Sequence, residues 1–256
     1  MLKEYDQIDH WKKLMVTYES ALKQMRARIE ILNDEFRQVH DYNPIEHIKS
    51  RIKSPEGIVK KLQKHGHEVT IENMVEHLND IAGLRIICSF TSDIYQIANM
   101  ISLQDDIQVL TVKNYIENPK ESGYQSYHMV VTVPVFLTDG RVDTKVEIQI
   151  RTIAMDFWAS LEHKLYYKFA GNAPSNLSRD LVECAEIVRT LDAKMLSLNE
   201  QIQDLERQVD VNVIPEQKNL EAEYKAKMLE QEIQKKDKQE VDKVLKRNTS
   251  DNTERK

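Results

Sequence analysis

Glycine is confined to the middle of this chain, and this distribution constrains the fold more than any other sequence feature. All six glycines lie between Gly57 and Gly171. Because glycine marks turns and sites of close backbone approach, we expect turns and strands in the centre and long helices at both ends. A domain typically takes about 100–200 residues, so a chain of 256 residues has room for one substantial domain with helical extensions.

Two apolar stripes support the helical ends. Between Trp11 and Phe36, and again between Leu181 and Val209, apolar residues recur at alternating steps of three and four. This spacing gathers them on one face of a helix, and Asn43-Pro44 ends the first helix. Each stripe packs on its own domain or contacts another subunit, and the sequence leaves both alternatives open. The two stripes are natural partners for each other, within one chain or between chains.

The remainder of the C-terminal region is highly charged. Beyond Pro215 only Leu220, Tyr224 and Ile233 form a thin apolar stripe, which predicts a second, weaker helix followed by a disordered tail. We therefore divide the chain into an N-terminal helix (1–42), a central domain (43–171), C-terminal helices that serve oligomerisation (172–245) and a tail (246–256).

Composition excludes several classes of protein. The net charge of −6 argues against a surface that binds nucleic acid throughout. Two cysteines, Cys88 and Cys184, exclude a disulfide scaffold and a four-thiolate zinc site made by one chain. The first residues lack the apolar core of a signal peptide, and no stretch approaches the roughly 18 apolar residues of a membrane helix. We expect a soluble cytoplasmic protein without a membrane partner, and we do not expect a nucleic-acid partner.

The central region alternates between two kinds of pattern. Strand patterns occur at 85–90, 107–112, 127–133 and 145–150, and helix patterns at 94–103 and 152–169. This mixture predicts an α/β or α+β fold, in which helices pack on a sheet.

The strand at 145–150 carries the first group of candidate functional residues. Because side chains alternate across a strand, Glu147, Gln149 and Arg151 share a face opposite Val146 and Ile148. A solvent-facing strand has the same pattern, but the combination of carboxylate, amide and guanidinium favours a site. In Asp80-Ile-Ala-Gly-Leu-Arg85, the acid and the arginine suit a metal ligand and a phosphate-binding group; a helix end with a surface ion pair is the alternative.

Two further segments carry suitable chemistry. Six Lys and Arg residues lie between Lys49 and Lys64, against the single acid Glu56, which suits polyphosphate binding or a solvated charged face. Tyr124 follows Gly123 in a turn, where it either stacks on a nucleotide base or packs inside a loop. Lys120 and His128 lie within reach of phosphates in the first case.

These segments, in this order, resemble the nucleotide-binding elements of the RelA/SpoT-type alarmone synthetases. The matching segments are 50–62, 80–85, 123–128 and 147–152, and residues 154–163 resemble the small, stand-alone members. The resemblance implies a nucleotidyltransferase-like mixed sheet flanked by helices, with a (p)ppGpp synthetase domain at 43–171. It also implies a homotetramer built by the terminal helices.

The reaction implied by the resemblance is transfer of the β,γ-pyrophosphoryl group of ATP to the 3′-hydroxyl of GTP or GDP, for stringent-response signalling. Asp80 and Glu147 match the carboxylates that hold Mg²⁺, and Glu147 is also the candidate general base. The residues that match the ATP side are Arg51, Lys53, Lys61, Lys64 and Arg85. The residues that match the GTP or GDP side are Lys120, Tyr124, His128, Gln149 and Asp156.

Two other functions stay open at this stage. The chain is a catalytically degenerate scaffold that binds nucleotides or RNA, or it is a nucleotidyltransferase that releases pyrophosphate. A P-loop is not among the candidates, since the motif G-x-x-x-x-G-K-[ST] is absent from the sequence.

Overall fold

The computed structural model describes residues 2–168, 175–212 and 227. Its helices are α1 (Leu2–Val39), α2 (Pro55–Lys64), α3 (Ile71–His77), α4 (Thr91–Ser102), α5 (Ile153–Lys168) and α6 (Ser175–Asn212). Its strands are β1 (Ile45–Ile52), β2 (Ala82–Cys88), β3 (Gln108–Asn114), β4 (Tyr127–Leu137) and β5 (Gly140–Thr152). Apart from Lys227, the helix predicted beyond Pro215 and the tail 246–256 lie outside the described residues.

The strands form one mixed sheet in the order β1-β2-β5-β4-β3. Strands β2 and β5 run parallel, and the other neighbouring pairs are antiparallel. The predicted fold class, a mixed sheet flanked by helices, is confirmed. The sequence patterns did not predict β1 or α3. Strand β1 buries only Ile45, so its apolar signal is weak, and its basic residues dominate the pattern.

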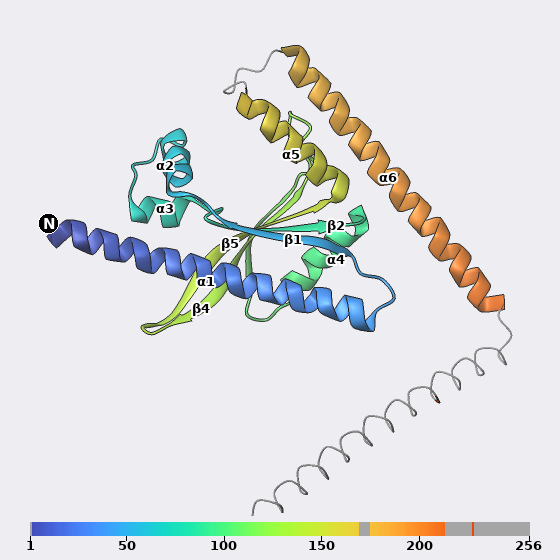
Figure 1. Cartoon of the computed structure of the whole chain (residues 1–256), viewed down its shortest axis with the longest axis horizontal. Helices are drawn as coiled ribbons and strands as arrows, with labels where there is room; N and C mark the ends of the chain where they lie inside the picture. The colour runs from blue at the N-terminus through green and yellow to red at the C-terminus, as the bar shows by residue number, and fades with distance from the viewer. Residues whose placement is uncertain (1, 169–174, 213–226, 228–256) are drawn as a thin grey trace, which may run out of the picture. The chain divides into compact units, whose positions relative to one another are not determined.

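Helix α1 lies across the sheet (Figure 1). Its apolar stripe is buried, with Tyr18, Leu22, Met25 and Ile29 in the same core as Ile148 of β5. Burial of one large apolar side chain contributes about 1.5–3 kcal/mol, so the sheet is the partner of this stripe. The expectation that the N-terminal and C-terminal stripes pair with each other is therefore wrong for the described residues, because the sheet already covers the first stripe.

Helix α6 is held by a smaller set of contacts. The chain forms two units, 1–198 and 199–256, and these contacts lie in the first. Leu181 and Ala185 are buried against Trp158 of α5, whose Nε1 donates a hydrogen bond to the Leu181 carbonyl at 3.0 Å. The Thr152 hydroxyl donates to Asp192 Oδ2 at 2.7 Å.

The predicted C-terminal stripe is buried only in its first part. Leu181 faces the domain, whereas Leu191, Met195 and Leu198 are exposed. None of the helices in the described part of the chain is long and apolar enough to span a membrane.

Candidate functional site

The sheet register brings the polar residues of three strands into one row. Gln149 of β5 pairs with Arg85 of β2 on one side and with His128 of β4 on the other. Glu147 lies two residues earlier on the same face of β5, opposite Gly83, while Val146 and Ile148 are buried on the other face. The alternation read from the sequence thus places one polar face of β5 between two strands that also carry polar side chains.

Asp80 precedes β2 and lies between two lysines. Lys53 Nζ is 2.9 Å from Asp80 Oδ2, and Lys61 Nζ is 2.8 Å from Oδ1. Helix α2 brings Lys61 to this position because it starts directly after β1, with Ser54 as its N-cap and Pro55 in its first turn. Burial alone raises the pKa of Asp80, but hydrogen bonds and charge from Lys61 and Lys53 outweigh burial, so this pKa is lowered.

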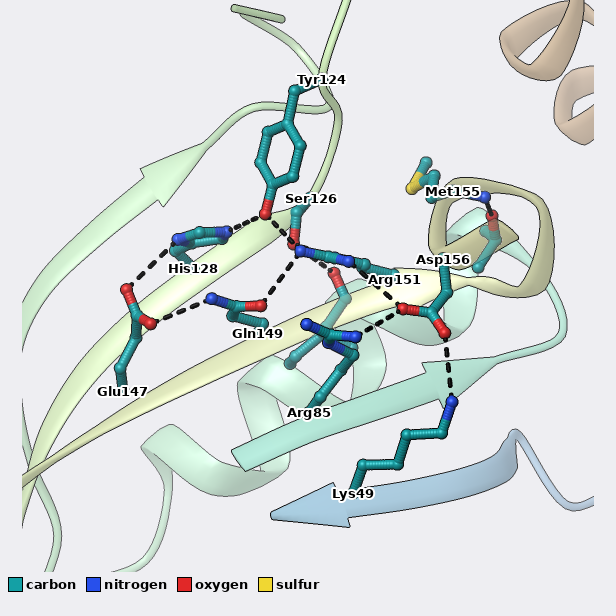
Figure 2. Close-up of polar contacts among 12 residues, drawn as sticks. Lys49, Arg85, Tyr124, Ser126, His128, Glu147, Gln149, Arg151, Met155 and Asp156 are labelled. Atoms are coloured by element: carbon teal, nitrogen blue, oxygen red, sulfur yellow. Dashed lines mark hydrogen bonds and ion pairs between the residues drawn. The ribbon is translucent and has the colours of Figure 1, made fainter. Parts of the chain in front are cut away.

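Glu147 is held on both of its oxygens. His128 Nδ1 lies 3.5 Å from Oε1, and the Gln149 amide donates to Oε2 at 2.9 Å (Figure 2). Burial raises the pKa of Glu147, and the nearby charge of Asp80 raises it further, but the interactions with His128 and Gln149 lower it below its ordinary value. The carboxylate is therefore ionised at neutral pH.

Tyr124 lies in the turn before β4. Gly123 has a φ of +85°, a conformation that favours glycine. The Tyr124 hydroxyl contacts His128 Nε2 at 2.8 Å and accepts a hydrogen bond from Arg151 at 2.5 Å. The Lys120 amine lies 4.7 Å from the centre of the Tyr124 ring. The Arg151 guanidinium carbon lies 5.0 Å from the same centre, so two cations contact the ring.

Asp156, in the first turn of α5, gathers three cations. Its Oδ1 accepts hydrogen bonds from Arg85 at 3.0 Å and from Arg151 at 3.2 Å, and its Oδ2 lies 3.4 Å from Lys49 Nζ. The carboxylate is buried, so these cations compensate its charge. Asp156 connects the arginine of β2 with the arginine of β5.

Two cavities lie beside these groups. One has a volume of about 230 Å³ and is lined by Arg51, Arg85, Glu147 and Gln149 among others. The second, of about 400 Å³, shares both arginines and Gln149 and is also lined by Tyr124 and Arg151. The two cavities are therefore adjacent and suit two ligands that meet at Gln149 and the two arginines, with Glu147 on the side of the first cavity.

The donor set for a metal ion is limited to carboxylates. Among the described residues, no group of three or more His, Cys, Asp and Glu side chains is arranged to hold a metal. Asp80 and Glu147 are close enough for the charge of one to raise the pKa of the other. Mg²⁺ is commonly held by one or two carboxylates together with substrate phosphates. These two residues fit such an ion, provided that a phosphorylated ligand completes its shell.

Comparison with known proteins identifies the family. Residues 50–172 match the region found in RelA / SpoT proteins. Over 195 residues, which are 76% of this chain and 93% of the relative, the sequence is 48% identical to the GTP pyrophosphokinase YwaC of Bacillus subtilis. The chain belongs to the RelA/SpoT family. GTP pyrophosphokinase YjbM of the same organism is 35% identical over 197 residues, covering 76% of this chain and 90% of the relative.

Solved structures of the family agree with the fold. The small alarmone synthetase 1 from Bacillus subtilis, in a crystal structure with its product pppGpp, matches with a TM-score of 0.71 and 34% identity, covering 76% of this chain and 98% of that one. The small alarmone synthetase 2 of this organism matches with a TM-score of 0.68 and 46% identity, covering 75% and 98%.

Most of the residues singled out in the sequence by the family motifs meet in two groups. Lys53 and Lys61 meet at Asp80. On the acceptor side, His128 and Gln149 contact Glu147 and Tyr124 contacts His128, whereas Asp156 contacts Arg85 of the ATP side. Lys64 is exposed at the end of α2. Sequence reasoning assigned no role to Arg151, although its place in the alternation of β5 put it on the face of Glu147. It also assigned none to Lys49, which the pattern marks only as one of several basic residues.

Proposed function

We propose that the chain is a GTP pyrophosphokinase, which transfers the β,γ-pyrophosphoryl group of ATP to the 3′-hydroxyl of GTP or GDP and releases AMP and (p)ppGpp. The observation that carries the proposal is one cavity lined by the Glu147 carboxylate and by two arginines, Arg51 and Arg85. The activity in the names of the two similar Bacillus subtilis pyrophosphokinases supports it.

ATP takes the side of Arg51, Arg85 and α2. The planar guanidinium groups of the two arginines stack on adenine, which a lysine amine cannot do. The amines of Lys53 and Lys61, with Lys64 one turn further along α2, bind the phosphates. Lys53 and Lys61 already face Asp80, so phosphates that bind there share the same two cations with this carboxylate.

GTP or GDP takes the side of Tyr124. The guanine base stacks on the Tyr124 ring, an interaction worth about 1–3 kcal/mol per base, while Lys120 and His128 contact acceptor phosphates. Gln149 and Asp156 complete this side of the site. Gln149 lines both cavities, which supports a role for its amide near the point where the two nucleotides meet.

The reaction needs alignment and charge neutralisation more than covalent chemistry by the protein. A Glu147 oxygen accepts the proton of the acceptor's 3′-hydroxyl while the hydroxyl oxygen forms a bond to the β-phosphorus of ATP. The bond between the β-phosphorus and the oxygen of the α-phosphate breaks, which releases AMP. Asp80 and Glu147 hold Mg²⁺, which supplies charge neutralisation on the transferred phosphates when bound.

The assembly is a homotetramer of a cytoplasmic protein that acts in stringent-response signalling. The exposed apolar residues Leu191, Met195 and Leu198 on α6 support self-association, because an apolar helix face of this kind is typical of subunit contacts.

The deciding experiment measures products from ATP with GDP, with GTP and without acceptor, in the presence of Mg²⁺. We expect AMP release that depends on the acceptor, no free pyrophosphate, and loss of about 10²–10⁴-fold in Glu147→Gln, whose thermal unfolding should match the wild type. Pyrophosphate release would instead indicate a nucleotidyltransferase. Nucleotide binding without any turnover would favour the degenerate scaffold.

A further inference from the structure

The polar residues around Glu147 form a closed ring of contacts (Figure 2). Starting at Glu147, the contacts run through His128 to the Tyr124 hydroxyl, on to Arg151 Nη2, and back through Gln149 to the other oxygen of Glu147. The residue that stacks on the acceptor base is thereby joined to the candidate general base by two routes. Only the Arg151 member of the ring has not been given a role in binding or chemistry.

Arg151 is the most deeply buried member of this ring, with 4% of its surface exposed. Its Nε donates to Ser126 at 3.2 Å and its Nη1 to Asp156 at 3.2 Å, and its Nη2 serves both Tyr124 and Gln149, the latter at 3.0 Å. A guanidinium carries five N–H donors in a rigid plane. Its orientation is therefore fixed by Ser126 and Asp156, and Nη2 points towards the two acceptor-side residues.

We propose that Arg151 is a positioning residue for the acceptor nucleotide, an inference that rests on the proposed function. Through Nη2 it fixes the Tyr124 ring by its hydroxyl and the Gln149 side chain by its amide oxygen. Gln149 in turn donates to Glu147. Arg151 thereby sets the stacking surface for guanine and the orientation of the base that meets the acceptor hydroxyl.

The ATP side depends less on Arg151. Its contact with that side runs through Asp156, which also holds Arg85 at 3.0 Å and lies beside Lys49. Those two cations still compensate Asp156 when Arg151 is replaced. Lys53 and Lys61 are held at Asp80, which is not a member of the ring. Loss of Arg151 should accordingly weaken the binding of the acceptor nucleotide far more than the binding of ATP.

The test compares Arg151→Lys and Arg151→Met with wild type, using GDP as the acceptor and a non-hydrolysable ATP analogue. A lysine keeps the charge but cannot reach Ser126, Asp156, Tyr124 and Gln149 together. A hydrogen bond to a charged group is worth roughly a tenfold to hundredfold change in affinity. We expect both variants to bind GDP about 10- to 100-fold more weakly and the ATP analogue within about twofold. In turnover, KM for GDP should rise and kcat should fall.

Tyr124→Phe is the second variant, because it keeps the stacking ring and removes only the hydroxyl held by Arg151. It should weaken GDP in the same direction, and its effect should not add fully to that of Arg151→Lys, since the two changes break a shared contact. Equal weakening of GDP and ATP analogue by Arg151→Lys, or fully additive effects with Tyr124→Phe, would overturn the proposal. If the wild type binds both nucleotides but forms no product, the proposed function fails, while the split in binding still tests Arg151.

Discussion

The two long helices carry apolar stripes of the same spacing, yet the structure uses them in opposite ways. The stripe of α1 is buried under the sheet, with Met25 and Ile29 fully inaccessible. In α6, Leu181 and Ala185 are buried against α5, while Leu191 and Met195 remain about half exposed. The difference teaches that periodicity identifies an apolar face, whereas the area of the neighbouring surface decides what covers it. A five-stranded sheet can cover a whole helix, but one end of α5 covers only a short part of α6.

The largest loss of stability is expected at the centre of the buried stripe of α1. Met25→Asp places a carboxylate in a site with no exposed surface, and we expect it to destabilise the fold by about 4 kcal/mol or more, because the charge has neither solvent nor partner. Ile31→Asp is the matched control, since Ile31 lies on the same helix and is 65% exposed. Chemical denaturation measures both variants. A folded Met25→Asp protein with near-normal stability would mean that α1 does not seal this core.

The same substitution in the second stripe should leave the fold intact. Leu191→Asp combined with Met195→Asp changes side chains that are already exposed in one chain. The free energy of unfolding of the monomer should therefore stay within about 0.5 kcal/mol of the wild-type value. If this face joins subunits, the variant should dissociate, because buried charges there lack partners. Light scattering distinguishes the two states. An unchanged particle mass in the variant would exclude this face as the subunit contact.

The sequence predicts the elements of the fold that depend on periodicity. Helix α5 was expected at 152–169 and spans Ile153–Lys168, because helical spacing is a local signal. Alternation likewise located β5 at 145–150, but the strand begins five residues earlier, at Gly140. Strand β1 was not expected, since Lys49 and Arg51 lie on an exposed edge strand and conceal its alternation. The seven-residue helix α3 is too short to show a helical period.

The candidate site shows the same limit. Family motifs selected Asp80, Glu147 and Tyr124, whose side-chain types already indicate metal, base and stacking chemistry. The role of Arg151 follows only after the fold is known, because its partner Ser126 lies 25 residues away in the chain and Asp156 lies beyond the end of the strand, in α5. A long-range polar ring of this kind has no short sequence signature.

The contact between α6 and the turn that carries Tyr124 is narrow enough to be tested by one methyl group. A Cβ at Gly123 would lie 2.6 Å from the Ala185 Cβ, whereas at Gly66 nothing lies within 4 Å. Both glycines have positive φ, +85° and +74°, so Gly123→Ala and Gly66→Ala share a backbone penalty of about 1–2 kcal/mol. We expect Gly123→Ala to lower the free energy of unfolding more than Gly66→Ala does, and also to weaken the binding of GDP. Adding Ala185→Gly should recover part of the difference; no recovery would place the strain elsewhere.

The smallest expected effect concerns Asp192. Helix α6 buries this carboxyl group against the domain, whereas the buried stripe of α1 is apolar. Burial outweighs the hydrogen bond from Thr152, so the pKa of Asp192 is raised in the folded protein. A raised carboxyl pKa means that the folded state binds the proton more tightly than the unfolded state. The resulting stability is fully present below the ordinary pKa and is lost as the pH rises through the higher folded value.

The variant Asp192→Asn tests this pH dependence, because it keeps an oxygen that accepts the Thr152 hydrogen bond and removes the titrating group. At one fixed protein concentration, the unfolding free energy of wild type should therefore fall relative to Asp192→Asn as the pH rises from the ordinary carboxyl pKa of about 4 through the raised pKa of Asp192. A wild type that gains stability over the variant as the pH rises would show that the buried carboxylate is stabilised in its charged form, and that α6 docks through an ionic contact.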